Sequence, residues 1–285
     1  MADRDRFEFG ANWQRFLETV DESRIEVAVR SLKQMLGVES LAGQRFLDVG
    51  SGSGLFSLAA HRLGASVHSF DYDAQSVACT REMKRRFAPE ADDWTIEEGS
   101  ALDAGYLAAL PPADVVYSWG VLHHTGDMWT AIDLVSQRVK PGGRCWLAIY
   151  NDQGRTTADW IRVKRCYQAL PAFLRPLLVT VVGGCLLTHR LIRAAGSSLV
   201  HLLTLGNPLT PFRTLADSVQ APDPRGMSRW YDLVDWVGGW PFEVARPEQV
   251  IDCLAERGFT QQTLKTVGGR MGCNEFVFVR RTSGE

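Results

Sequence analysis

The chain has 285 residues, of which 45% are hydrophobic and 22% are charged, the composition of an ordinary globular protein. Its 31 Lys and Arg residues are offset by 33 Asp and Glu residues, so the net charge of -2 provides no overall positive field and argues against a nucleic-acid partner. The six cysteines form no CxxC pair, and no short apolar segment follows a basic N-terminus as in a secretory signal. We therefore expect reduced thiols, a cytoplasmic protein and no bound metal.

The first 44 residues predict a helical cap. Trp13, Phe16, Leu17 and Val20 recur at the spacing of one helix face, and a second, mostly apolar pattern continues over residues 25–36. We therefore expect helices, and no strand, before residue 45.

Between residues 45 and 150, short apolar runs alternate with helical patterns. The runs that we predict to be strands are 45–50, 66–73, 94–99, 113–120 and 144–150. Parallel neighbours need a crossover long enough to return, so this alternation predicts a parallel sheet that is covered on both faces. The predicted class is α/β, with a doubly wound, mostly parallel, seven-stranded sheet.

The alternation lapses after residue 150 and resumes near the end of the chain. A helical pattern at 247–258 is followed by two apolar runs, 259–267 and 274–281, which we expect to pair as a hairpin. The predicted domains are a helical cap (1–44), an α/β core (45–150), a helical insertion (151–246) and a completion of the core (247–285).

A glycine-rich turn follows the first predicted strand, in the run FLDVGSGSG at residues 46–54. In a doubly wound sheet, ligands bind at the carboxyl ends of the strands. A dinucleotide fingerprint needs glycine at position 55, where this chain has Leu55. The carboxylate of Asp48 would repel a pyrophosphate and attract an ammonium group. Asp71, at the end of the next strand, is placed to bind both hydroxyls of a ribose, and Tyr72 to lie against an adenine.

Four motifs, LDVGSGSG, FDYD, SWGVLHHTGD and KPGG, resemble in this order the motifs of the class I S-adenosylmethionine-dependent methyltransferases. The resemblance covers residues 45–150, with a tail at 247–281, and is greatest to the methylases of ubiquinone and menaquinone biosynthesis. It implies a Rossmann-like methyltransferase fold and S-adenosylmethionine as cofactor. At Ser100 the chain departs from the family, many members of which have Asp there. The expected cofactor-binding residues are Asp48, Gly50, Ser51, Gly52, Gly54, Asp71, Tyr72, Ser100, Ala101 and Trp119.

His123 and His124 follow the fourth predicted strand. Methyl transfer from a sulfonium needs a base only where the nucleophile must lose a proton, and histidine suits that role near neutral pH. We expect one of the two to act, because neighbours on a regular element diverge. Alternatively, the pair packs beneath the cofactor. The ring of Trp119 either stabilises the sulfonium cation or fills the core.

The first part of the insertion, residues 151–206, combines seven Lys and Arg residues with two acids and long apolar runs. It predicts a lid that meets a membrane through residues 172–205 or admits an apolar substrate; alternatively, its helices pack on the domain or on a second copy in a homodimer. The run Pro176–Leu187 is shorter than the roughly 18–20 residues that cross a bilayer. Its two glycines, Gly183 and Gly184, predict a sharp turn or a close approach.

Aromatic and acidic residues are mixed in the stretch 225–243, which predicts either the wall of an acceptor pocket or a packing surface. The expected substrate-binding residues are Tyr150, Trp230, Asp235, Trp236, Glu243 and Asn274. We predict methyl transfer to oxygen of a small-molecule or lipid-like acceptor, with a carbon on an electron-rich ring as the alternative. An NAD(P)-dependent oxidoreductase and a non-catalytic binding module are the other classes. The expected location is the cytoplasm, including the inner face of the membrane.

Overall fold

A computed structural model describes residues 10–220, 229–268 and 272–282. The chain divides into two compact units, one formed by Met1–Ile161 with Gly239–Glu285 and the other by Arg162–Gly238. The second unit is shorter than the insertion of residues 151–246 expected from the sequence, because both ends of that segment fold with the α/β core.

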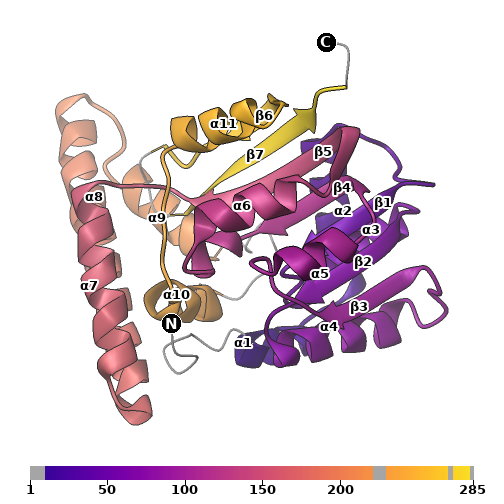
Figure 1. Cartoon of the computed structure of the whole chain (residues 1–285). Helices are drawn as coiled ribbons and strands as arrows, with labels where there is room; N and C mark the ends of the chain where they lie inside the picture. The colour runs from indigo at the N-terminus through magenta and orange to yellow at the C-terminus, as the bar shows by residue number, and fades with distance from the viewer. Residues whose placement is uncertain (1–9, 221–228, 269–271, 283–285) are drawn as a thin grey trace. The chain divides into compact units, whose positions relative to one another are not determined.

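The first unit is built on a seven-stranded sheet with the order β3-β2-β1-β4-β5-β7-β6 among the described residues (Figure 1). Its strands are β1 (Arg45–Val49), β2 (Ser66–Asp71), β3 (Trp94–Glu98), β4 (Ala113–Trp119), β5 (Val139–Tyr150), β6 (Phe259–Lys265) and β7 (Cys273–Arg280). The first five strands run parallel, and β7 is antiparallel to both β5 and β6. The predicted mostly parallel sheet and its closing pair of strands are therefore confirmed. Residues 269–271 of the expected hairpin lie outside the described part.

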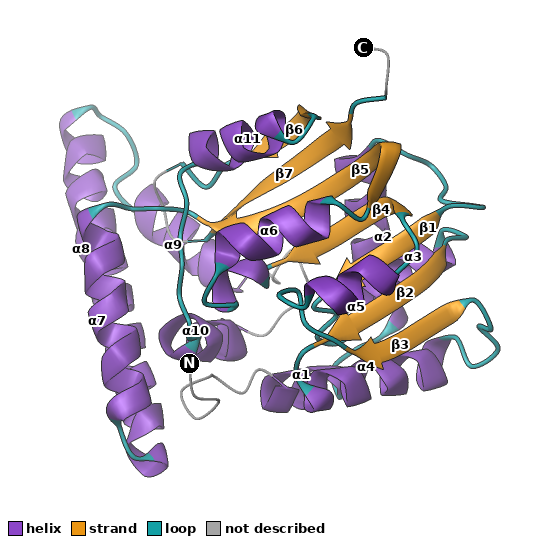
Figure 2. Ribbon diagram, in the orientation of Figure 1, coloured by secondary structure: helices purple, strands orange, loops and turns teal. Residues whose placement is uncertain are grey.

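Helices cover both faces of this sheet, with α5, α6 and α11 in front of it and α2 and α3 behind it in Figure 2. The helices of the unit are α1 (Gly10–Leu17), α2 (Glu22–Leu36), α3 (Leu55–Arg62), α4 (Ala74–Phe87), α5 (Ala104–Ala109), α6 (Met128–Ser136) and α11 (Pro247–Glu256), with a short helix η2 (Leu122–His124). On the front face, Val116, Leu147 and Phe276 of the strands pack with Ile132 of α6 and Leu254 of α11. Burial of these apolar side chains fixes the helices on the sheet.

The strand β5 begins earlier than the sequence predicted. Ala113 of β4 pairs with Val139, and Val115 then pairs with Arg144, so β5 has four residues (140–143) opposite one residue of β4, and the three extra residues bulge from the ladder. The left-handed backbone of Gly142, with φ of 76°, permits this bulge. The segment read as a turn before the strand is therefore an irregularity inside it.

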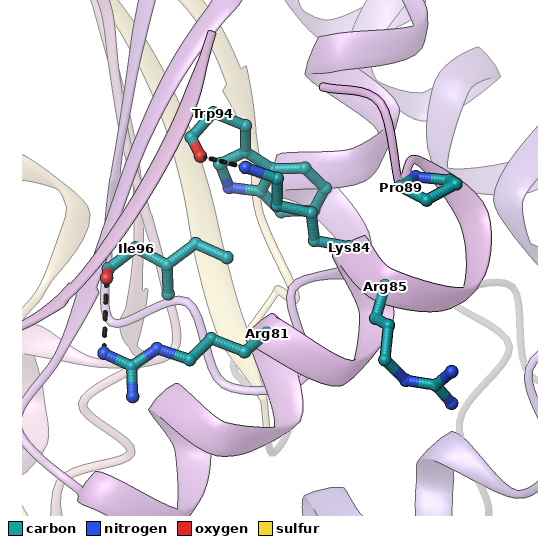
Figure 3. A pocket seen from close by; sticks show the side chains of 6 residues that line it. All are labelled: Arg81, Lys84, Arg85, Pro89, Trp94 and Ile96. Carbon is teal, nitrogen blue, oxygen red and sulfur yellow. Dashed lines mark hydrogen bonds between the residues drawn. The ribbon is translucent and has the colours of Figure 1, made fainter. Parts of the chain in front are cut away.

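The strand β3 forms one edge of the sheet, and cations from α4 cover that edge (Figure 3). Lys84 Nζ donates to the carbonyl of Trp94 at 2.6 Å, and Arg81 donates to the carbonyl of Ile96 at 3.5 Å. Together with Arg85, these residues line a surface pocket. Their donors occupy carbonyls that would otherwise be available to a strand of another molecule, so we assign this pocket to protection of the sheet edge.

The second unit is helical. It contains most of α7 (Arg155–Ala169), then a short helix η3 (Ala172–Leu174), α8 (Arg175–Leu203), α9 (Thr210–Gln220) and α10 (Arg229–Gly238). The helix α8 continues through Gly183 and Gly184, so of the two alternatives expected there the sharp turn is wrong, and the close approach is found at Gly183. A Cβ at Gly183 would lie 2.9 Å from Leu233 of α10, and this close packing is the physical reason for one of the two glycines. With η3, α8 is long and apolar enough to cross a membrane, and only 6% of its most apolar window is buried.

Candidate functional site

The turn between β1 and α3 is shaped by three glycines. Gly50, Gly52 and Gly54 have φ values of 79°, 54° and 77°, in the left-handed region that residues with a Cβ rarely adopt. A Cβ at any of the three would come within 2.4 to 2.9 Å of a neighbouring side chain. The turn is closed by Gly54 N–H donating to the carbonyl of Ser51 at 2.8 Å. It is thus a tight backbone loop, with little side-chain bulk, at the carboxyl end of the central strand.

The carboxylate of Asp71 is fastened to this turn. Its Oδ2 accepts a hydrogen bond from Gly52 N–H at 2.9 Å, and its Oδ1 accepts one from Asp73 N–H at 3.0 Å. Each carboxylate oxygen keeps a second lone pair, so the partly exposed Asp71 can still accept from two adjacent hydroxyls. Tyr72, the next residue, has a side chain that is half exposed. The structure therefore brings the glycine turn and Asp71 together, as the sequence predicted from two separate motifs.

Asp48 lies beneath the same turn and is buried. Ser57 Oγ on α3 donates to Asp48 Oδ2, and Ser57 is in turn bonded to Ser69 Oγ at 2.7 Å. Burial raises the pKa of the Asp48 carboxyl to about 7, the bond from Ser57 opposes this, and the charge of Asp71 adds to it. A carboxyl group held in this state favours the approach of a cation, because a nearby positive charge would offset the cost of ionising it.

The ends of β3 and β4 complete the rim of the site. Gly99 N–H donates to the carbonyl of Asp71 at 3.0 Å, and this bond sets Ser100 beside the end of β2. Ser100 Oγ accepts from the backbone N–H of Leu102 at 3.2 Å, while Ala101 is buried in the core. Trp119 is partly exposed at the last position of β4. Partial exposure is compatible with both roles expected for Trp119, an aromatic lining of the site and a filler of the core.

His123, in the short helix η2, is fully buried. The backbone N–H of Tyr150 donates to His123 Nδ1 at 3.3 Å, and the two rings lie with centroids 3.8 Å apart. Because Nδ1 accepts, the proton of the neutral ring is on Nε2. The backbone carbonyl of His123 also accepts from Glu243 N–H at 3.0 Å. These contacts make His123 a connector between β5 and the segment after the second unit.

His124 has a different arrangement. Its Nδ1 lies 2.5 Å from the carbonyl oxygen of Pro241, which can only accept, so Nδ1 carries the proton and Nε2 is the basic nitrogen of the neutral ring. The ring is packed edge-on against Tyr150, with centroids 5.3 Å apart. An imidazole whose tautomer and orientation are fixed by one carbonyl is the more suitable base of the pair.

Glu243 and Asn274 were expected to face an acceptor. Their side chains instead form hydrogen bonds with other segments of the chain. The Glu243 carboxylate accepts from Gly126 N–H at 3.1 Å and from Met128 N–H at the start of α6, and burial raises its pKa. The buried Asn274 donates to Asn151 Oδ1 at 3.0 Å and accepts from a backbone N–H. Both side chains therefore position the loops around His124.

The remaining expected acceptor residues belong to α10 of the second unit. Trp230 is exposed, whereas Trp236 is buried, and its carbonyl accepts a hydrogen bond from Lys164 Nζ. Burial lowers the pKa of the fully buried Lys164 to about 7, and the charge of Asp235 acts in the opposite direction. The structure thus places Asp235 and Trp236 beside a lysine that the sequence gave no reason to single out.

The sequence analysis also missed the contribution of α1 to the site. Gly10 N–H donates to Asp73 Oδ2 at 2.9 Å, and a Cβ at Gly10 would lie 2.4 Å from Gln75 Cβ, so the helix approaches α4 closely. This brings the indole of Trp13 onto the glycine turn, where a Cβ at Gly52 would lie 2.9 Å from Trp13 Cε2. The signal in the sequence was Gly10, which permits a close approach of the helix, followed three residues later by Trp13 on the same helix face.

The carboxyl ends of β1, β2 and β4 therefore meet at one rim, with a glycine turn, a clasped carboxylate and a buried acid. This arrangement is typical of doubly wound α/β proteins, whose ligands bind outside the carboxyl ends of the strands. Residues 47–145, about a third of the chain, match the methyltransferase domain family. The matching segment is the α/β core, which is therefore similar to a methyltransferase domain. Among the described residues, no three His, Cys, Asp or Glu side chains are grouped so that they could hold a metal ion.

Among curated proteins, the chain is 32% identical over 123 residues to a ubiquinone biosynthesis O-methyltransferase of Cronobacter sakazakii, a match covering 42% of this chain and 47% of that protein. The protein of the same description from Cupriavidus pinatubonensis is 30% identical over 122 residues, which is 40% of this chain and 45% of the relative. The matched region thus spans less than half the length of each relative.

Among solved structures, magnesium protoporphyrin IX methyltransferase from Synechocystis PCC 6803 with bound SAH is 14% identical, with a TM-score of 0.53 and coverage of 95% of this chain and 93% of that one. The [4+2]-cyclase SpnF is 13% identical, with a TM-score of 0.51 and coverage of 91% and 81%. These likenesses establish the Rossmann-like methyltransferase fold. A protein described as a cyclase shares that fold, so the reaction has to be argued from the site.

Proposed function

We propose that this protein transfers a methyl group from S-adenosylmethionine to an oxygen atom of a small-molecule or lipid-like acceptor. The observation that carries the proposal is the clasp in which Gly52 N–H binds the Asp71 carboxylate above the buried Asp48. It combines a place for a ribose, a place for an ammonium group and a backbone turn too tight for a side chain. The ubiquinone O-methyltransferase relatives support oxygen as the atom methylated.

The residues present fit that cofactor. The residues assigned to the site include two acids, Asp48 and Asp71, and no cationic side chain. This charge suits a ligand whose amino acid end carries an ammonium group and does not suit a pyrophosphate. Asp71 would hold the ribose hydroxyls, Asp48 the ammonium group, and Gly50 to Gly54 the backbone along the methionine part, with Tyr72 and Ala101 beside the adenine. When bound, the cofactor supplies an electrophilic methyl group on a sulfonium.

The chain's own contribution to the reaction is alignment and proton removal. Direct displacement requires the acceptor oxygen to be held in line with the methyl group, and such positioning supplies roughly 7–11 kcal/mol of barrier reduction. We assign His124 Nε2 to the removal of the acceptor's proton, because Pro241 fixes its tautomer. His123 is then a positioning residue, since its Nδ1 is bonded to the backbone of Tyr150.

The proposal for the acceptor and for the partners rests on the composition of the second unit. The apolar, basic segment 172–205 supports a lipid-like acceptor, with either a membrane or a second copy of the chain against that segment. We propose a cytoplasmic protein that reaches the inner face of the membrane. Tyr150 of β5 is the proposed acceptor-facing residue in the first unit. Trp230, Asp235 and Trp236 of α10 stay separate proposals within the second unit.

Calorimetry with S-adenosylhomocysteine, followed by mass spectrometry of a cell extract incubated with isotope-labelled S-adenosylmethionine, tests the proposal. We expect binding of the homocysteine product and a labelled product whose methyl group is attached to oxygen. Label on a ring carbon would favour the C-methylation alternative. Binding of a reduced dinucleotide in its place would favour an oxidoreductase, and binding without any labelled product a non-catalytic module. Each of these three results would overturn the proposed O-methylation.

A further inference from the structure

The helix α8 presents a long apolar face that the described protein leaves exposed. Leu177, Ile192 and Leu203 have exposed fractions of 61%, 65% and 76%. At 100° per residue, most of the exposed apolar side chains gather on one side of the helix, and only the exposed Val200 of the described α8 residues lies outside this face. This apolar face of α8 consists of Leu177, Val181, Leu187, Leu191, Ile192, Leu199, Leu202 and Leu203. Val179 and Ala194 of α8 are buried, so the helix is covered at these two positions while its apolar face stays open.

Charge in the same segment is mostly positive, and none of the charged residues belongs to the apolar face. Residues 172–220 contain four arginines, two histidines and a single acid, Asp217, so the net charge with neutral histidines is four minus one, or +3. Arg190 and Arg193 project from the side of α8 opposite the apolar face. A segment that is apolar on one side and cationic on the other matches the boundary between acyl chains and anionic headgroups.

The spacing of the arginines decides between crossing and lying in a membrane. Only residues 176–189 separate Arg175 from Arg190, and these 14 residues rise about 21 Å in a helix, whereas a hydrocarbon core is about 30 Å thick. A spanning orientation would place the guanidinium groups of Arg190 and Arg193 inside the hydrocarbon, which is costly. When α8 instead lies parallel to the membrane plane, the guanidinium groups of Arg190 and Arg193 reach the headgroups while the apolar face reaches the acyl chains.

We propose that α8 docks the protein in the plane of an anionic lipid bilayer, with its apolar face against the acyl chains and Arg190 and Arg193 at the phosphates. A second copy of the chain fits less well, because a two-fold contact repeats the same excess of cations on both sides and Asp217 alone supplies an acid. The inference names the partner that a lipid-like acceptor requires, and to that extent it rests on the proposed function.

Vesicle flotation of the full-length protein tests this docking. The probes are vesicles of phosphatidylcholine alone and of an equal mixture of phosphatidylcholine and phosphatidylglycerol. We expect the protein to float with the anionic vesicles and to stay mostly in solution with the neutral ones. Ile192→Glu, on the apolar face, should lower the partition coefficient by more than about tenfold. The matched control Gln34→Glu adds the same charge to an exposed position on α2 of the first unit and should float like the parent.

The arginines are tested separately from the apolar face. The double variant Arg190→Gln and Arg193→Gln should bind anionic vesicles about tenfold more weakly and neutral vesicles unchanged. S-adenosylhomocysteine binding, measured on every variant, should stay at the parental value, which shows that the α/β core is folded and separates a failure of docking from a failure of the proposed function. The docking is overturned if the parent stays in solution with both vesicle types, or if Ile192→Glu instead converts a dimer into a monomer in sedimentation.

Discussion

The indole of Trp13 lies against Gly52, the glycine whose N–H binds the Asp71 carboxylate. A residue near the start of the described chain is thereby placed on the turn proposed to bind the amino acid part of the cofactor. The contact depends on α1, which is tied to α4 by Gly10 N–H donating to Asp73 and by Arg86 donating to the carbonyl of Leu17 at 2.6 Å.

Trp13→Ala should weaken S-adenosylhomocysteine binding by about three- to tenfold, because the turn loses an aromatic wall that stacks near a cationic ligand. Calorimetry measures the change. Trp129→Ala is the matched control, since this tryptophan is exposed on α6 and its loss should leave the affinity unchanged. Equal affinities for the Trp13 variant and the parent would show that the indole packs on the turn without meeting the ligand.

Asp71→Ala should weaken cofactor binding by roughly 1–3 kcal/mol, because hydrogen bonds from the ribose and from Gly52 N–H lose their acceptor. Asp73→Ala removes the cap of α4 and the tie to Gly10, so it controls for damage to the neighbouring structure. The measurement is again calorimetric, with thermal unfolding recorded for both variants. If Asp71→Ala binds as tightly as the parent, the sugar lies elsewhere.

The α/β core was predictable because its signals are local. Each strand from β1 to β4 is an apolar run that ends in a glycine or an acid, and these end residues meet at one rim because parallel strands share a carboxyl edge. The extent of β5 was mispredicted because Pro141, Gly142 and Gly143 resemble a turn in sequence, whereas the pairing of Val139 with Ala113 continues the strand beyond them.

The contacts that the sequence did not reveal are those between distant segments. Glu243 resembles a substrate ligand in sequence, but its carboxylate binds backbone N–H groups at the start of α6, 115 residues away. Gly183 and Gly184 resemble a turn because glycine weakens helices, yet the helix continues through both, and Gly183 packs closely against Leu233. Tertiary partners of this kind leave no period in the sequence, so local patterns could not predict the roles of these residues.

His124→Ala should lower kcat by about 10²- to 10⁴-fold if the acceptor is a hydroxyl, while cofactor affinity stays unchanged. The effect should be greatest near neutral pH and shrink at high pH, where the acceptor loses its proton unaided. His123→Ala is the comparison, because its ring packs on Tyr150 and its removal should lower the free energy of unfolding more than it affects the pH profile. Retention of full turnover by His124→Ala at every pH would exclude it as the base.

The pH dependence of stability should report the buried Asp48. Its pKa is raised from 3.8 to about 7 in the folded protein, so folding favours the protonated form. This group's contribution is therefore fully present below pH 4 and is lost as the pH rises to about 7, at a cost on the order of a few kcal/mol. Asn at position 48 cannot ionise, so Asp48→Asn should not lose this contribution to stability as the pH rises.

Urea unfolding of the parent and of Asp48→Asn at pH 5 and pH 8 isolates the effect, since other titrating groups are common to both proteins. The difference in unfolding free energy between the two pH values should be smaller in the variant, so that Asp48→Asn gains stability relative to the parent at pH 8. Saturating S-adenosylhomocysteine should also reduce the loss in the parent, because its ammonium group favours the ionised carboxylate. Parallel pH profiles for parent and variant would mean that Asp48 is ionised in the ligand-free protein throughout this range.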